Sequence, residues 1–149
     1  MDVCDEKTGF LSATFRAVYG DRFKIESKLG AGSIGEVYKA TDTVLNRTVA
    51  LKKIRTDYFS SGEDTDELRL VFLREAREAA RLHHPNIVTI DDIISTPDLS
   101  LIVMDFIDGI TLREKLNTEK SLTLGQTVRI LSQVTDALEH APSREVIHR

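Results

Sequence analysis

The chain lacks the cysteines and the charge imbalance that mark several common classes of protein. Cys4 is the only cysteine among 149 residues, so an internal disulfide framework and a thiolate-rich zinc site are both excluded. This cysteine usage fits a reducing compartment, and we expect a cytoplasmic protein. A surplus of positive charge is also missing, because 20 basic side chains face 24 acidic ones, for a formal net charge of −4. Nucleic acid and anionic membrane surfaces are therefore disfavoured as partners.

Long hydrophobic runs are scarce as well. The longest ones, such as Leu101–Met104, have the length of a strand and fall far short of the roughly 20 residues that cross a bilayer. The first residues are acidic where a secretory signal is basic, so we expect neither export nor membrane contact from this segment. Internal repeats and low-complexity tracts are absent, which argues against a solenoid. With 41% hydrophobic and 30% charged residues, the chain is expected to form an ordinary domain with a core.

Three short segments rich in strand-forming residues open the folded part of the chain. Residues 1–22, which precede them, show no sustained period and are interpreted as an N-terminal extension. The three segments are separated by a cluster of glycines and by the turn-like pair Asn46-Arg47. This order predicts two hairpins of an antiparallel sheet. The predicted strands are Phe23–Leu29, Glu36–Thr41 and Thr48–Ile54.

A helix and two further strands are predicted next. The helix follows the polar residues 60–64 and runs to about Leu82, because acids lie at its start, Arg81 lies near its end and Pro85 stops it. The pair Pro97-Asp98 marks a turn between two apolar runs that complete the sheet. These predicted strands are Ile87–Ile94 and Leu99–Ile107.

The remainder of the chain, from Gly109 onward, has the period of α-helices. Thr111 with Glu114, and Thr123 with Gln126, each match a capping box, so a helix is predicted to begin at each pair. The predicted fold is α+β, with a five-stranded antiparallel sheet and one inserted helix, followed by further helices. A parallel doubly wound sheet is excluded, because the strands come in consecutive hairpins and do not alternate with helices.

Gly30, Gly32 and Gly35 form the pattern G-x-G-x-x-G. A dinucleotide-binding turn with this pattern opens into a helix, whereas the residues that follow here are strand-like. A Walker A loop needs Lys and then Ser or Thr after its last glycine, where this chain has Glu36 and Val37. Two interpretations remain. The pattern is either a purely structural turn or a glycine-rich hairpin whose backbone amides approach phosphate oxygens closely.

Two lysines and a glutamate are candidates for a charged site. Lys52 and Lys53 fall on opposite faces of the third strand, and periodicity alone does not choose between them. Glu75 falls on the apolar stripe of the predicted helix, and burying an unpaired carboxylate costs several kcal/mol. We therefore expect Glu75 to pair with a strand lysine, the alternative being a glutamate at the helix edge that reaches water. The stripe consists of Leu68, Val71 or Phe72, Ala79 and Leu82.

These motifs occur in the order that is characteristic of protein kinases. From about Phe23 to its last residue, the chain resembles the N-terminal part of a protein kinase, and it is most similar in texture to bacterial-type serine/threonine kinases. The resemblance implies that residues 23–108 form a kinase N-lobe, which includes the hinge. Residues 109–149 would be the beginning of a helical C-lobe. Four segments carry it: the glycine loop ending in Val37, the strand Val49–Lys52, the helix with Glu75, and the closing Val146–Arg149.

The same resemblance implies that ATP binds with Mg²⁺, and it gives a role to each site residue. Lys52 would hold the α- and β-phosphates while pairing with Glu75, which selects Lys52 over Lys53. For Met104, plain core packing is an equal alternative. The loop over the phosphates would comprise Gly30, Ala31, Gly32, Ser33 and Gly35. The walls of the adenine pocket would be Leu29, Val37 and Ala50, with Met104 at its back. Backbone groups from Asp105 to Ile107 would bind the adenine edge, and Asp108 would accept from the ribose hydroxyls.

The implied activity needs residues that are not among these 149. The sequence stops one position before the aspartate that acts as catalytic base in His-Arg-Asp. The downstream Asn, the Asp-Phe-Gly metal ligand and the activation loop are also missing. The resemblance implies that a complete kinase transfers the ATP γ-phosphate to Ser or Thr hydroxyls of protein substrates, and we expect these residues alone to be inactive.

The alternative to an enzyme is a pseudokinase or an interaction module that keeps a nucleotide-binding lobe. In kinases the helix at 123–141 packs inside the helical lobe, so we expect its apolar stripe to need a missing C-lobe or a partner chain. The identity of the protein substrate, and a membrane tether beyond residue 149, stay open.

Overall fold

The computed structural model describes residues 20–32, 35–54, 65–96 and 99–141, except for the side chains at 65–69, 71 and 72. Ser33, most of the predicted extension and the closing Val146–Arg149 therefore lie outside the described residues. Within them the chain forms one five-stranded antiparallel sheet, with strand order β1-β2-β3-β5-β4, and three helices. This confirms the predicted α+β fold. The strands are β1 (Phe23–Ala31), β2 (Gly35–Asp42), β3 (Arg47–Ile54), β4 (Ile90–Thr96) and β5 (Leu99–Asp105), and the helices are α2 (Thr65–Ala79), α3 (Leu112–Glu119) and α4 (Leu124–His140).

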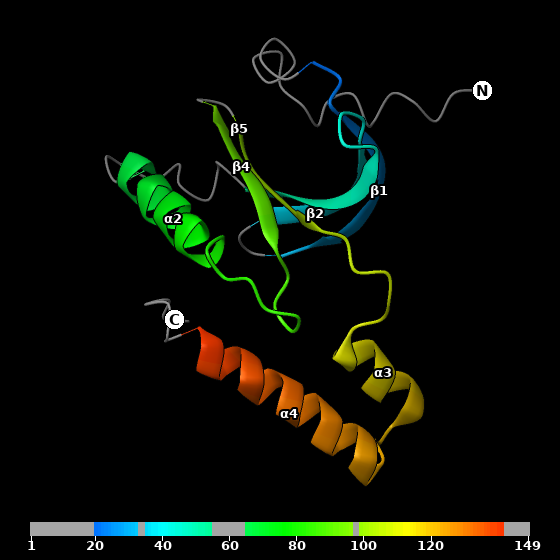
Figure 1. The fold of residues 1–149 in the computed structure, drawn as a ribbon. Coiled ribbons are helices and arrows are strands. Elements are labelled where there is room, and N and C mark those ends of the chain that lie inside the picture. Colours follow the sequence, from blue (N-terminus) through cyan, green and yellow to red (C-terminus); the bar gives the residue numbers. More distant parts are fainter. Residues whose placement is uncertain (1–19, 33–34, 55–64, 97–98, 142–149) are drawn as a thin grey trace, which may run out of the picture.

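The sheet and α2 form one part of the molecule, and α3 and α4 form a second part (Figure 1). α2 lies beside β4 and β5, and the segment that follows β5 leads from the sheet to α3. No helix in the described ranges combines the length and the apolar character that crossing a bilayer requires.

The turn before β4 is longer than the sequence indicates. The strand predicted to begin at Ile87 begins at Ile90, because the chain first folds into a turn. In this turn the Ile87 amide donates to the His84 carbonyl at 3.0 Å, and the Asn86 amide donates to His84 Nδ1 at 3.1 Å. One backbone bond and one side-chain bond thus keep Ile87 out of the sheet, and hydrophobicity alone does not reveal them.

The two faces of the sheet bury different clusters of apolar side chains. Successive residues of a strand point to opposite faces, so alternate positions belong to each cluster. The smaller cluster joins Ile54 of β3 and Ile102 of β5 to Ala76 of α2. α2 therefore covers the face of the sheet to which Ile54 points. The larger cluster, on the opposite face, consists of Phe23, Ala40, Val49, Leu51, Ile94, Leu99, Leu101 and Val103.

Arg22, just before β1, forms hydrogen bonds to residues of β2 and β4 at one end of the sheet. Its Nε and Nη2 donate to Asp42 Oδ2 at 3.1 and 3.0 Å, and its Nη1 donates to Asp92 Oδ2 at 2.9 Å. Asp42 is fully buried, and its Oδ1 accepts from the amides of Val44 and Leu45. Burial works in the opposite direction, but the bonds from Arg22 and from these amides hold the pKa of Asp42 below its usual value. Arg22 is thus bonded to the sheet, although the sequence analysis assigns it to the extension.

Both predicted capping boxes are present. Thr111 Oγ1 accepts from the Glu114 amide at 3.1 Å, and Glu114 Oε2 accepts from the Thr111 amide at 2.7 Å. Thr123 and Gln126 make the same reciprocal pair, at 3.2 and 2.8 Å. Neither α3 nor α4 contains a buried residue. The apolar stripe of α4 is exposed along its whole length, at Leu124, Val128, Leu131, Val134 and Leu138.

Candidate functional site

The register of the sheet brings four of the predicted site residues to one face. Val37 of β2 pairs with Lys52 of β3, and Ala50 of β3 pairs with Met104 of β5. Directly paired residues of antiparallel strands point to the same face, and so do residues two apart in one strand. Lys52 thus shares its face with Val37, Ala50 and Met104. Lys53 pairs with Glu36 of β2, and its side chain lies on the opposite face. The register separates two lysines that periodicity alone could not tell apart.

The glycine pattern forms the hairpin between β1 and β2. Gly30 pairs with Val37, and the Gly32 amide donates to the Gly35 carbonyl at 2.8 Å. A Cβ at Gly35 would lie 2.1 Å from the Lys53 carbonyl oxygen, so only glycine lets β2 approach β3 at this point. A Cβ at Gly30 or Gly32 would meet no atom of the described residues within 4 Å. Packing therefore explains Gly35, whereas Gly30 and Gly32 border open space that a ligand can fill.

A charged cluster on the opposite face joins β1 to β2 at the base of this hairpin. Glu36 Oε1 lies 2.5 Å from Lys28 Nζ, and Glu36 Oε2 accepts from the Tyr38 hydroxyl at 2.9 Å. The hydrogen bond from Lys28, followed by the one from Tyr38, lowers the pKa of Glu36. Burial, together with the adjacent Glu36 carboxylate, raises the pKa of Tyr38 to about 12. The hairpin is thus held on the face opposite to Lys52.

Glu75 is exposed, so it does not lie on the buried stripe where its spacing placed it, and its position fits the alternative of a glutamate at the helix edge that reaches water. Among the side chains of α2 that the structure describes, those of Leu73 and Ala76 are buried. An α-helix turns by about 100° per residue, and Glu75 consequently falls well outside the arc between these two positions. Among the described residues, Lys52 and Glu75 form no ion pair with each other. The pairing of Glu75 with Lys52 stays a prediction. Leu82 is buried as predicted, although it lies beyond the end of α2.

The chain leaves the sheet at Asp105, the last residue of β5. The Asp105 amide donates to the Thr89 carbonyl at 3.0 Å, which ties this end of the strand to the turn before β4. Within the described part of the chain, the backbone groups of Phe106 and Ile107 have no hydrogen-bond partner. Their amides and carbonyls are therefore available to a ligand. Several predicted site residues are exposed, namely Leu29, Gly30, Ala31, Gly32, Ile107 and Asp108.

A cavity of about 680 Å³ opens between the turn before β4, the segment after β5 and α4. Asp105 and Ile107 line it, but the glycines, Ala50 and Lys52 do not. It is therefore distinct from the predicted adenine pocket, with which it shares only this edge. The His84 ring, in its wall, lies 5.1 Å from the ring of His140 at the end of α4.

Comparison with known proteins identifies the family. The model of the protein kinase domain matches residues 23–149. The chain belongs to the protein kinase family. This kinase chain is 36% identical over 128 residues to the serine/threonine-protein kinase PrkC of Bacillus subtilis, a match that covers 86% of the chain and 19% of PrkC. It is 37% identical over 133 residues to the serine/threonine-protein kinase PknB of Mycobacterium tuberculosis, covering 87% of the chain and 21% of PknB.

The kinase chain is also similar to solved structures. It superposes on the PknI kinase domain of Mycobacterium tuberculosis with a TM-score of 0.73 and 30% sequence identity, covering 87% of this chain and 51% of that structure. The chain thus spans about half of that kinase-domain structure and about a fifth of the curated relatives it matches. These findings confirm the resemblance to bacterial-type serine/threonine kinases.

The described part of the kinase has no group of three or more His, Cys, Asp or Glu side chains that could hold a metal ion. It does have two side chains beside the end of β5 that the sequence analysis missed. Arg47, the first residue of β3, forms ion pairs with Asp91 and Asp105, and Lys39 of β2 lies over the ring of Phe106. No spacing in the sequence points to these contacts, because each cation lies 44 or more positions from its partners along the chain, so only the fold brings them together.

Proposed function

We propose that this part of the kinase binds ATP between the glycine hairpin and the face of the sheet that carries Lys52. The carrying observation is the register that gathers Val37, Ala50, Lys52 and Met104 on one face. Two features support it at the ends of that face: the open space at the hairpin glycines, and the unbonded backbone of Phe106 and Ile107. A flat purine with hydrogen-bonding edges and a triphosphate tail matches both ends at once.

Each group of the site then has a task. Lys52 holds the α- and β-phosphates, the hairpin amides approach the phosphate oxygens, and the backbone of Asp105–Ile107 bonds the adenine edge. Val37 and Ala50 pack against the flat adenine, and Asp108 accepts from the ribose hydroxyls. Glu75 can pair with Lys52 only after α2 turns, because the structure leaves this carboxylate in solvent.

In the complete kinase, the bound ATP gives its γ-phosphate to Ser or Thr hydroxyls of protein substrates. Mg²⁺ supplies charge neutralisation at the phosphates, and kinase residues outside these 149 hold it. The general base also comes from outside them, and its loss alone costs about 10²- to 10⁴-fold in rate. The 149 residues on their own therefore bind and orient the nucleotide without transferring phosphate at a useful rate.

Titration of a fluorescent ATP analogue tests the nucleotide site. Lys52→Met should weaken binding about tenfold or more, because it removes a charge-assisted contact to phosphate. Lys53→Met is the matched control, since it removes the same charge from the opposite face of the same strand and should change the dissociation constant by less than about twofold. Equal effects of the two substitutions would refute the assignment.

A pseudokinase or interaction module is the second candidate, and the exposed Glu75 favours it, because active kinases need the lysine–glutamate pair in place. Transfer of radiolabelled phosphate from ATP to a mixed protein substrate by the complete kinase separates the two. Transfer that Lys52→Met abolishes supports the enzyme, whereas nucleotide binding without any transfer supports the pseudokinase.

A further inference from the structure

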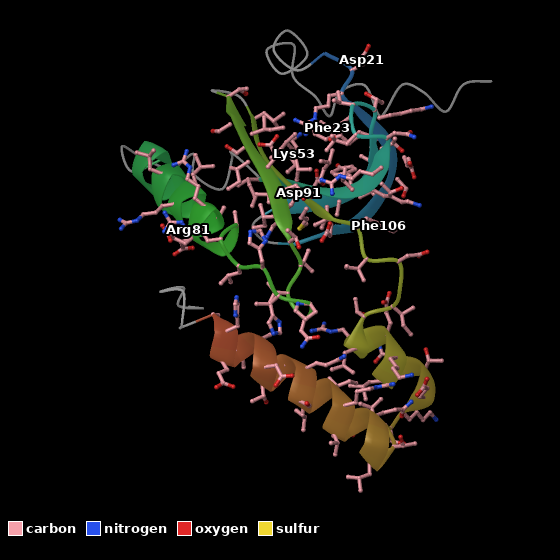
Figure 2. All side chains as sticks on the ribbon, in the orientation of Figure 1. Asp21, Phe23, Lys53, Arg81, Asp91 and Phe106 are labelled. Atoms are coloured by element: carbon pink, nitrogen blue, oxygen red, sulfur yellow. The ribbon has the colours of Figure 1, made fainter. Side chains whose placement is uncertain are left out.

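Arg47 connects three strands at the end of the sheet where the hinge begins. Its Nη2 lies 2.8 Å from Asp91 Oδ2, and its Nη1 lies 3.9 Å from Asp105 Oδ1. Arg47 is the first residue of β3, Asp91 belongs to β4 and Asp105 is the last residue of β5. Figure 2 shows Asp91 on β4 and Phe106 where the chain leaves β5 toward α3. One guanidinium thus reaches the residue that precedes the unbonded hinge backbone.

A β-bulge places the first of these carboxylates. Ile90 pairs with Met104 and Asp92 pairs with Val103, so Asp91 is the extra residue that faces no partner on β5. Bulges re-aim a side chain at the cost of regular pairing. Here the bulged residue is the one that makes the shorter contact with Arg47, and its side chain is largely shielded, with 21% exposed.

A second cation holds the next hinge residue. Lys39 Nζ lies 4.9 Å from the centre of the Phe106 ring, a distance typical of a cation–π contact. The same ammonium lies 3.4 Å from Glu26 Oε2 of β1, which fixes it from the other side. The sheet therefore grips the side chains of Asp105 and Phe106, whereas the backbone of Phe106 and Ile107 is left without a partner in the described residues.

Arg47 itself does not point at the proposed nucleotide. Along β3, Arg47 lies on the same face as Val49 and Leu51, whose side chains belong to the larger buried cluster. Lys52 lies on the opposite face. An effect of Arg47 on nucleotide binding must therefore pass through Asp105 and the hinge backbone.

We propose that Arg47 is a positioning residue for recognition of the adenine base. By holding the Asp105 carboxylate against β3 and β4, it sets where the free amide and carbonyl groups of the following two residues lie, and thereby which base edge they fit. This inference rests on the proposed nucleotide site and adds to it the residue that aligns its base-reading backbone. Loss of Arg47 should weaken the hydrogen bonds to the adenine base and leave the contacts to the phosphates unchanged.

Dissociation constants of fluorescent ATP and GTP analogues, measured on the 149-residue chain, test this. Arg47→Met should weaken ATP binding about tenfold, as expected for one or two misaligned hydrogen bonds, and leave GTP binding within about twofold. The preference for ATP over GTP should then fall about tenfold. Arg47→Lys, which keeps one charge, should restore part of that preference. Arg81→Met, which breaks an exposed ion pair with Glu78, is the matched control and should leave the preference unchanged.

The possible results separate the two proposals. Equal weakening of both nucleotides by Arg47→Met, or no weakening of either, overturns the role of Arg47 while the nucleotide site stands. A wild-type chain that binds neither nucleotide overturns the nucleotide site and the role of Arg47 together. If Arg47→Met does not fold, as far-UV circular dichroism would show, Asp105→Ala removes the same contact and should reduce the preference in the same way.

Hydrogen exchange without nucleotide gives a second readout. The Asp105 amide is protected by its bond to the Thr89 carbonyl, so Arg47→Met should speed its exchange at least several-fold. Amides in α4 should be unaffected, because that helix lies apart from the sheet (Figure 1). Unchanged exchange at Asp105 would show that Arg47 does not hold the hinge, whatever the nucleotides do.

Discussion

Replacing Asp42 by alanine should destabilise the sheet strongly. The carboxylate is fully buried and accepts four hydrogen bonds, two from Arg22 and one each from the amides of Val44 and Leu45. In the variant the guanidinium keeps only Asp92, and both amides lose their acceptor. Removing one partner of a buried ion pair costs about 3–5 kcal/mol. Because Arg22 is 22% exposed and retains one carboxylate, we expect the lower end, about 3 kcal/mol.

Thermal unfolding of the 149-residue chain measures this loss. For a chain of this size, 1 kcal/mol corresponds to roughly 2–4 °C, so the Tm of the sheet should fall by about 6–12 °C. Glu78→Ala is the control, because its ion pair with Arg81 is exposed and should contribute less than about 0.5 kcal/mol. An Asp42→Ala variant within about 1 kcal/mol of the wild type would refute the reasoning, since it would mean that Arg22 and the two amides find other partners at no cost.

The same residue predicts how stability depends on pH. Its pKa in the folded chain is lower than the ordinary value of 3.8, so the folded state favours the charged carboxylate. Such a group contributes its full stability above the unfolded pKa, and this contribution is lost as the pH falls through the folded pKa. The wild type should therefore lose stability below about pH 4, and the Asp42→Ala variant should lose less over the same range. Equal losses in the two proteins would exclude Asp42 as a source of the acid sensitivity.

Two further pairs of substitutions test the hairpin and the N-cap of α4. Gly35→Ala would place its Cβ 2.1 Å from the Lys53 carbonyl oxygen and should cost about 1–3 kcal/mol in urea unfolding. Gly30→Ala, whose Cβ would meet no atom of the described residues within 4 Å, should be close to neutral, and similar costs for the two variants would contradict the packing explanation. Thr123→Ala should lower the helicity of α4 by removing its N-cap, a loss of about 1 kcal/mol, and Thr127→Ala, one turn further on, should have a smaller effect on the circular dichroism signal; the reverse order would contradict the cap.

The parts of the fold that depend on local patterns could be predicted from the sequence. The capping boxes at Thr111 and Thr123 are examples, because each is complete within four residues and needs no distant partner. The order of strands and helix is another, since hairpins and breaks are set by nearby glycines and prolines. The start of β4 was missed, because two hydrogen bonds to the backbone and side chain of His84 form a turn there, and residue hydrophobicity does not reveal these bonds.

The candidate site shows the same division. Period-two alternation predicted that Lys52 and Lys53 point to opposite faces, but only the pairing with β2 shows which of them shares a face with Val37. Glu75 was misplaced because three- and four-residue spacings allow more than one stripe on a helix, and packing against Ile54 and Ile102 selects the one with Ala76. The ion pairs of Arg47 with Asp91 and Asp105 join residues far apart in the chain, so no local pattern contains them.

The absence of buried residues from α3 and α4 has a consequence for what a stability measurement reports. A helix that buries almost no surface against the sheet is stabilised little by the folded sheet. Its thermal unfolding therefore depends mainly on its own caps and helix propensity. Asp42 and Thr123 then govern two separate transitions within one polypeptide. A single midpoint averaged over both would describe neither, and each half has to be followed with its own probe.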